Sequence, residues 1–253
     1  MYQQLRRKQR KLLRGIIRTY IRHEGEPYKA SEWWDEDFYD QEISDAATIA
    51  RSRSSVAAMY HYASVELLIL RHFGRFDIDP SGPVFDVGSG AGHWIRFYKQ
   101  LGASRCDGVD VSSKCVTAMQ AEFADDPAVT IHHGLCDEVL ETLNKQFDII
   151  NAIGVMFHIV DDDEWTHTIR CIGKRLNPGG VFIVGGHFGV FDNVNVQIDE
   201  RGRCNKRLRS IFRWRRILGD AGFTSIRRYQ NSAYLSISEP LPENNVLIAT
   251  KGA

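Results

Sequence analysis

Residues 84–94 of the chain spell Val-Phe-Asp-Val-Gly-Ser-Gly-Ala-Gly-His-Trp, an apolar strand that ends in a glycine-rich turn and opens a helix. Glycine lets a backbone turn sharply and lets a ligand lie against the main chain with no Cβ in the way. The spacing is Gly-x-Gly-x-Gly, whereas the dinucleotide fingerprint Gly-x-Gly-x-x-Gly would place glycine at His93. Asp86, inside the strand, offers nothing to a pyrophosphate but suits a cofactor with a cationic amino group. The stretch therefore predicts a cofactor site of a different kind.

From Val84 onward, short apolar strands alternate with helical stretches. Such alternation is typical of parallel strands joined by right-handed crossovers, with helices on both faces of the sheet. It predicts an α/β fold with a doubly wound, mostly parallel seven-stranded sheet, whose strands are expected near residues 84–87, 105–111, 128–133, 147–153, 180–186, 224–230 and 244–250. Ligands bind outside the carboxyl ends of the strands of such sheets, so the glycine turn lies at the expected binding edge.

Residues 1–79 are predicted to be a helical segment ahead of the domain at 80–253. Apolar residues at helical spacing indicate an amphipathic helix at 5–21, and Ser44-Asp45 can cap a second helix that runs to about Phe73. Beyond the fifth strand, an insertion at about 188–205 is too long for an ordinary connection, and alternation at 194–198 predicts a hairpin. A helix is expected from about Lys206 to Ala221. The hairpin and the N-terminal helices together would form a substrate lid.

Composition excludes several classes of protein. The 253 residues are 43% hydrophobic and 25% charged, which is typical of an ordinary globular chain, and no apolar run approaches the roughly 20 residues of a membrane span. A cytoplasmic location is therefore expected. Five scattered cysteines without a Cys-x-x-Cys pair argue against disulfides and structural zinc, and no metal is predicted. Basic residues in 1–23 raise a nucleic-acid or membrane-surface alternative, but the acids of 24–45 can neutralise them, so neither partner is favoured.

Several segments resemble, in order, the class I S-adenosylmethionine-dependent methyltransferases. Besides the glycine turn, Asp110 stands at the end of the second strand, 22 residues after Gly88, residues 147–162 are similar to the fourth strand and its loop, and residues 176–180 to the turn before the fifth. The resemblance covers about residues 83–250 and implies an S-adenosylmethionine-dependent methyltransferase with that cofactor. It implies that the cofactor is bound by Asp86, Gly88, Ser89, Gly90, Gly92, Asp110, Val111, Asp137, Asn151 and Ala152.

Two of these assignments carry a specific chemical role. In the family, the acid at the position of Asp110 forms hydrogen bonds with the ribose hydroxyls of the cofactor, and an ionised carboxylate can accept from both hydroxyls. Asp137 would contact the adenine, although it lies two positions beyond the usual place of the family's acid after the third strand.

Two histidines are the candidates for a catalytic base. His187 follows the fifth strand and His158 lies in the loop after the fourth, so both are expected at the carboxyl edge of the sheet. His187 is the preferred candidate, because many relatives have a histidine at the position of His158 that packs the cofactor pocket. The motif of nucleic-acid nitrogen methyltransferases is replaced by residues 151–154, and the metal ligands of catechol-type relatives are missing.

These observations favour methyl transfer to a hydroxyl of a small molecule or glycan. Within the same family, an amine, carbon or RNA acceptor is the alternative. From a different class, a protein that binds S-adenosylmethionine without catalysis and serves as a regulator or scaffold is the second alternative. The sequence indicates no oligomeric state.

Overall fold

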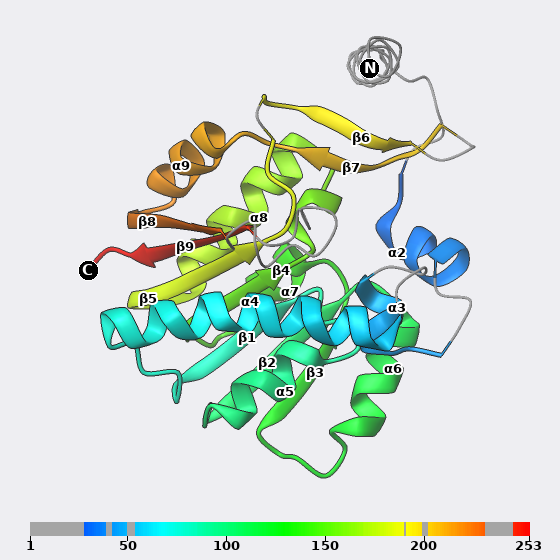
Figure 1. Ribbon diagram of the computed structural model, residues 1–253, viewed down its shortest axis with the longest axis horizontal. Coiled ribbons are helices and arrows are strands. Elements are labelled where there is room, and N and C mark those ends of the chain that lie inside the picture. The colour runs from blue at the N-terminus through cyan, green and yellow to red at the C-terminus, as the bar shows by residue number, and fades with distance from the viewer. Residues whose placement is uncertain (1–27, 39–41, 50–53, 190, 199–201, 231–244) are drawn as a thin grey trace, which may run out of the picture.

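The computed structural model describes residues 28–38, 42–49, 54–189, 191–198, 202–230 and 245–253 (Figure 1). Their centre is a seven-stranded sheet in the order β3-β2-β1-β4-β5-β9-β8. Its strands are β1 (Pro83–Val87), β2 (Arg105–Asp110), β3 (Val129–His133), β4 (Phe147–Ile153), β5 (Leu176–Gly185), β8 (Phe223–Gln230) and β9 (Asn245–Lys251). The strand count and the α/β architecture are confirmed. The sheet is mixed, because β9 pairs antiparallel with both β5 and β8.

Helices cover both faces of this sheet, as Figure 1 shows. One apolar core lies between the sheet and α7 (Cys136–Thr142), α8 (Asp162–Arg175) and α9 (Ile211–Asp220). The other lies between the sheet and α4 (Ser55–Phe76), α5 (His93–Gln100) and α6 (Ser113–Glu122). Because helices cover both faces of the sheet, its central strands β1 and β4 are almost wholly buried. Strands in this position are typically apolar along most of their length. Strand order reverses between β1 and β4, so the carboxyl ends of these strands form the binding crevice.

The N-terminal part differs from its prediction. The helix expected at 5–21 lies outside the described residues, and the single helix expected from Ser44 is two helices, α3 (Asp45–Ile49) and α4. Ser54 has an extended backbone and its side chain accepts a hydrogen bond from the amide of Ala57. This N-cap starts α4 afresh, which is why the helical pattern does not run through. Ahead of α3 lie a short helix, α2 (Ala30–Glu32), and the π-helix η1 (Trp33–Phe38).

The predicted hairpin is present. It consists of β6 (Val194–Ile198) and β7 (Cys204–Leu208), which pair antiparallel. The helix expected to begin near Lys206 therefore begins later, at Ile211, after the N-cap Ser210 accepts a hydrogen bond from the amide of Arg213. Few apolar residues mark the segment 204–208, so its basic side chains fit the surface of a helix or a strand equally well, and pairing with β6 decides the outcome.

Arg209, directly after β7, anchors the hairpin to the domain. Its guanidinium is 1% exposed, contacts the carboxylate of Asp162 at 2.9 Å, and donates to the carbonyls of Ile159 and Asp161 at 2.9 and 3.1 Å. It also lies over the ring of Trp165, 4.5 Å from the centroid. Burial lowers the pKa of Arg209 to about 10, and Asp162 opposes that change. The hairpin is thereby fixed to the loop that follows β4.

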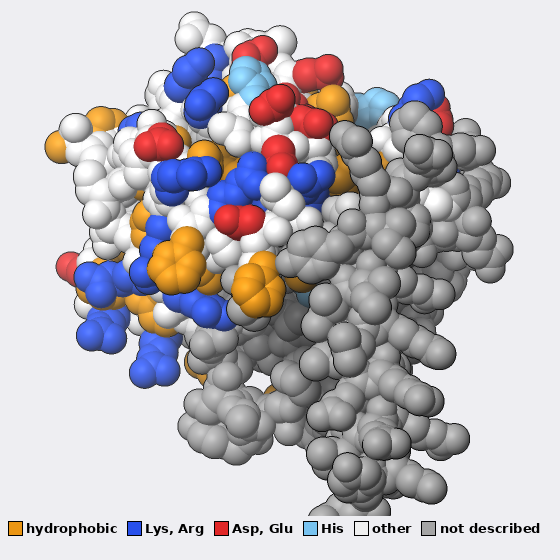
Figure 2. All heavy atoms as spheres, turned by 90° about the horizontal axis from the view of Figure 1, so that it is seen from above, with side chains coloured by type: hydrophobic (Ala, Val, Ile, Leu, Met, Phe, Trp, Pro, Cys, Tyr) orange, Lys and Arg blue, Asp and Glu red, His pale blue; other side chains and the backbone are white. Residues whose placement is uncertain are grey.

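Basic side chains around this anchor are offset by acids. Arg207 and Arg213 also contact Asp162, at 2.7 and 3.3 Å. Figure 2 shows Lys and Arg side chains gathered on this side of the described part, with acidic side chains among them. Mixed charge of this kind is a weaker attractant for polyanions than an uninterrupted basic patch. Among the described helices, none has the length and apolar character that crossing a membrane requires.

Candidate active site

The glycine turn after β1 has the conformation that its composition predicts. Gly88, Gly90 and Gly92 all have positive φ, at 65°, 55° and 81°. A Cβ built on Gly88 would lie 2.6 Å from a side-chain carbon of Val155, in the loop after β4. Both the backbone angle and the close approach therefore require glycine at this position. The turn brings the main chain to the crevice between β1 and β4.

A cavity of about 890 Å³ opens at this crevice. Seven of the predicted site residues line it: Gly88, Ser89, Gly90, Asp110, Val111, Asp137 and His158. The described wall does not include five others: Asp86, Gly92, Asn151, Ala152 and His187. The structure thus brings the turn and the acids after β2 and β3 together around one space.

Asp110 is held in place by main-chain amides. The amide of Gly90 donates to its Oδ2 at 2.8 Å, and the amide of Ser112 donates to its Oδ1 at 2.9 Å. Burial raises the pKa of Asp110, and these amide bonds oppose the rise. Each carboxylate oxygen keeps a second lone pair, so the group can still accept two hydroxyl protons. Asp137 lies in the first turn of α7, on the same cavity.

Asp86 lies behind the wall rather than on it. Neighbouring side chains on a strand point to opposite faces, and here Val87 lines the cavity. Oδ1 of Asp86 accepts a hydrogen bond from the side-chain amide of Asn151 at 2.7 Å, and Oδ2 is buried without a partner among the described residues. Burial raises the pKa of Asp86 to about 7, with a further rise from the charge of Asp110. Asn151, predicted as a cofactor ligand, is thus the partner of Asp86 and of the hydroxyl of Tyr98.

The two candidate bases have different environments. His158 lines the cavity, and its Nδ1 lies 2.6 Å from the carbonyl oxygen of Asn205. A carbonyl can only accept, so Nδ1 carries the proton and Nε2 is the acceptor. Burial lowers the pKa of His158 to about 3, and the charge of Lys206 adds to the fall. His187 packs edge-on against Phe157, and the ring of Phe157 also contacts that of His158. The preference for His187 over His158 is therefore not supported by the arrangement of the cavity wall.

Residues 84–180 match the family described as "Methyltransferase domain". The chain carries a class I S-adenosylmethionine-dependent methyltransferase domain. The match spans the glycine turn, Asp110, Asp137 and His158, and S-adenosylmethionine is the methyl donor of this family.

Curated relatives share this domain. The ubiquinone biosynthesis O-methyltransferase of Methylobacterium nodulans is 26% identical over 160 residues, which are 60% of this chain and 57% of that protein. The ribosomal protein L11 methyltransferase of Staphylococcus aureus is 27% identical over 107 residues, covering 42% and 32% respectively. The chain thus spans about half, or less, of the length of these relatives.

Solved structures share the fold. The magnesium protoporphyrin IX methyltransferase of Synechocystis PCC 6803, with bound S-adenosylmethionine, has a TM-score of 0.59 at 18% identity and covers 88% of this chain and 95% of that one. The 1,6-didemethyltoxoflavin-N1-methyltransferase of Burkholderia thailandensis has a TM-score of 0.56 at 16% identity, with coverages of 77% and 79%.

Part of the wall of the methyltransferase cavity comes from residues that sequence analysis missed. Tyr28, Trp33 and Trp34 contribute from the N-terminal segment, and Trp34 packs edge-on against His158 with ring centroids 4.8 Å apart. Thr48, His61 and Tyr62 contribute from α3 and α4. The Trp-rich composition of 32–37 was the available signal, but a sequence pattern does not say which face of the domain such a segment covers.

His93 fastens these helices to the cofactor turn. His93 is the first residue of α5. Its ring stacks on that of Tyr62 with centroids 3.5 Å apart, and its two nitrogens contact the carboxylates of Asp45 at 2.9 Å and Glu66 at 2.7 Å. Burial alone would lower the pKa of His93, but the hydrogen bonds to the two carboxylates outweigh it and raise the pKa. His93 stands where the dinucleotide fingerprint would have its third glycine, and here it joins the glycine turn to α3 and α4.

Proposed function

We propose that the protein transfers the methyl group of S-adenosylmethionine to a hydroxyl of a small molecule held in this cavity. The observation that carries the proposal is the arrangement of His158, which lines the cavity and whose Nδ1 proton is engaged by the carbonyl of Asn205, so that Nε2 is left as the acceptor of the ring. A hydroxyl oxygen that gains a methyl group must lose its proton, so it needs such an acceptor. The cavity volume lies in the range of small-molecule sites.

The residues present suit the cofactor. Asp110 would accept hydrogen bonds from the ribose hydroxyls and Asp137 would accept from the adenine amino group, while Gly88 and Gly90 contribute main chain to the cavity wall. Asp86 is buried with one unpartnered oxygen among the described residues, and a cationic ligand beside the turn would favour its ionised form. When bound, S-adenosylmethionine supplies an electrophilic methyl group carried by a sulfonium.

The low pKa of His158 sets the order of events. A base whose conjugate acid has a pKa of about 3 does not ionise a free hydroxyl ahead of reaction. It does accept a proton from an oxygen that already bears the incoming methyl group, because such an oxonium is a far stronger acid. We therefore assign His158 two tasks: its Nε2 orients the hydroxyl as a hydrogen-bond acceptor, and it takes the proton late in the transfer.

A second polar contact is available beside this base. Oδ1 of Asn205 is buried and has no hydrogen-bond partner among the described residues, and Asn205 lines the cavity. Buried acceptors of this kind normally find a donor. A substrate with another hydroxyl or N–H group near the reacting oxygen would supply it, which favours a polyhydroxylated or amide-bearing acceptor.

An amine acceptor is the second candidate, and acidic residues favour it. Asp137 and Glu164 both line the cavity, and burial raises the pKa of Glu164 with a further rise from Asp137. An amine would bind there as its ammonium form, which relieves this repulsion between carboxylates, and would pass one proton to a carboxylate before its nitrogen lone pair takes the methyl group. Structural analysis of the methylated product separates the two candidates, because the new carbon is bonded to oxygen in one and to nitrogen in the other.

Calorimetry with S-adenosylmethionine and its demethylated product tests the cofactor assignment first, and we expect micromolar binding of both. Incubation with labelled cofactor and separate fractions of hydroxylated metabolites, saccharides, amines and RNA then identifies the acceptor. With that acceptor, His158→Gln should lower turnover about 100-fold or more with cofactor affinity nearly unchanged. His187→Gln is the matched control and should stay near wild type. Loss of turnover in the control but not in His158→Gln would refute the assignment.

A further inference from the structure

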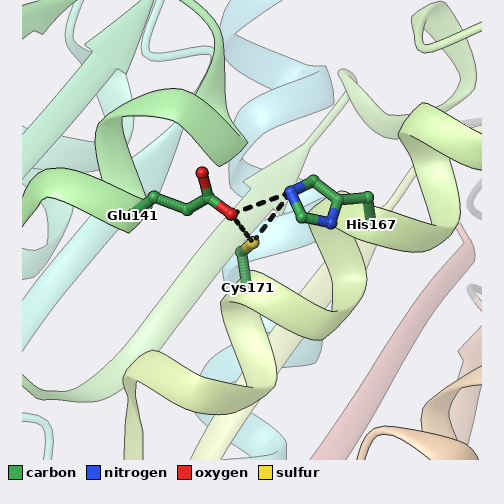
Figure 3. Close-up of side chains that lie close together, drawn as sticks. All are labelled: Glu141, His167 and Cys171. Atoms are coloured by element: carbon green, nitrogen blue, oxygen red, sulfur yellow. Dashed lines mark hydrogen bonds and ion pairs between the residues drawn. The ribbon is translucent and has the colours of Figure 1, made fainter.

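Away from the cavity, three metal-ligating side chains from two helices meet at one point. Figure 3 shows Glu141 of α7 pointing toward His167 and Cys171 of α8. Nε2 of His167 lies 3.0 Å from Oε1 of Glu141 and 3.6 Å from Sγ of Cys171, and Sγ lies 3.9 Å from Oε1. We propose that these residues form a binding site for a divalent transition metal of the zinc type, which bridges α7 and α8.

The distances between the three ligand atoms fit one tetrahedral ion. Typical zinc bonds to sulfur, nitrogen and oxygen at tetrahedral angles place the ligand atoms about 3.3 to 3.6 Å from one another. The observed separations of 3.0, 3.6 and 3.9 Å bracket that range, so small side-chain rotations suffice. Three protein ligands leave the fourth position for water.

The ligand set selects the class of metal. A thiolate and an imidazole suit zinc and its neighbours, whereas calcium and magnesium require oxygen ligands throughout. Binding replaces the thiol proton of Cys171, which is released to solvent, and takes the lone pair of Nε2 of His167. The contact between His167 and Glu141 in the metal-free arrangement would be exchanged for two bonds to the ion.

Hydrogen bonds from one arginine side chain already link the two helices. Arg175, at the end of α8, donates to the carbonyls of Leu140 and Glu141 at 2.7 and 3.0 Å. His167 and Cys171 are four residues apart on α8, which places them on one face of the helix. Preorganised ligands of this kind lose little conformational entropy on binding. Sequence analysis predicted no metal because it looked for closely spaced cysteines, and this site joins residues 26 positions apart.

Cobalt(II) is the spectroscopic probe, because a cobalt–thiolate bond gives a charge-transfer band that oxygen and nitrogen ligands alone do not. Titrating the reduced full-length protein with cobalt(II) should give this band at one equivalent, and zinc(II) should abolish it by displacement. Cys171→Ser should remove the band. His167→Ala, and separately Glu141→Gln on the exposed part of α7, should weaken zinc binding at least about tenfold.

Cys204→Ser is the matched control, because Cys204 is the least buried of the five cysteines and lies on β7. Its cobalt spectrum should equal that of the wild type. Absence of the thiolate band at equimolar cobalt, a band that persists in Cys171→Ser, or zinc affinity unchanged in Glu141→Gln would each overturn the bridging site. Because Glu141 is more than half exposed, its variant tests the site even where Cys171→Ser unfolds.

Discussion

Asp86→Asn should make the stability of the protein less dependent on pH. The carboxyl is 1% exposed, one oxygen has no partner among the described residues, and burial raises its pKa to about 7. Because the folded-state pKa is above the unfolded one, near 4, the protonated group favours the folded chain. That stabilisation is complete below about pH 4, is lost as the pH rises to about 7, and is absent above it.

The size of the effect follows from this pKa. The full difference between the two states corresponds to about 4 kcal/mol above pH 7, of which about 2 to 3 kcal/mol develops between pH 5 and pH 8. The asparagine of the variant would have no charge to desolvate and could still accept from Asn151. The free energy of unfolding of Asp86→Asn minus that of the wild type should therefore rise by about 2 to 3 kcal/mol over this interval.

Urea denaturation followed by circular dichroism at pH 5 and pH 8, without added cofactor, measures this difference. Other carboxylates and histidines titrate in both proteins and cancel. Asp125→Asn, at an exposed position, is the matched control, and its difference from the wild type should be nearly constant with pH. A difference for Asp86→Asn that stays constant or falls between pH 5 and pH 8 would show that Asp86 is not a buried, destabilising charge.

Three further outcomes are expected. Asp110→Ala should weaken the binding of S-adenosylmethionine and of its demethylated product together, by about tenfold or more in calorimetry, because the proposed charge-assisted hydrogen bonds to the shared ribose would be lost. Arg209→Met should lower the free energy of unfolding by about 1 to 3 kcal/mol, because the carbonyls of Ile159 and Asp161 lose their donor while Arg207 and Arg213 still contact Asp162. Arg215→Met, on an exposed position of α9, should be nearly neutral in the same denaturation assay. Lys206→Gln should raise the pKa of His158, since the lysine charge lowers it, and NMR titration of the imidazole protons would show no change if that charge were unimportant.

Features that depend on local sequence were predictable. The glycine turn needs positive φ at three positions, and only a run of glycines supplies that conformation readily. Asp110 and Asp137 follow strands of a parallel sheet, and the carboxyl ends of such strands meet at one edge, so their presence on one cavity follows from their place in the chain. The antiparallel direction of β9 was not predicted, because strand direction depends on connections that leave no mark on composition.

Features that depend on side-chain direction and long-range pairing were not predictable. His158 and His187 both follow strands at the same edge and both contact the ring of Phe157, yet only His158 lines the described cavity, a difference that depends on side-chain direction. Asp86 has the residue type expected of a cofactor ligand, but the alternation of the strand turns it toward Asn151. Likewise, residues 204–208 have a pattern that fits a helix or a strand equally well, and pairing with β6 makes them the strand β7.

The division of the cavity wall between two parts of the chain bears on the choice of acceptor. The side of the cavity that we propose holds the cofactor, with Gly88, Asp110 and Asp137, lies inside the region 84–180 that matches the methyltransferase family. Trp34, Tyr62 and residues 205–206 lie outside it, yet they line the same cavity. Trp34 packs against His158, and the carbonyl of Asn205 accepts from its ring. Interactions that distinguish one acceptor from another must come from groups that do not hold the common cofactor. Acceptor specificity is therefore expected to change with substitutions in these added segments, while cofactor affinity follows the matched region.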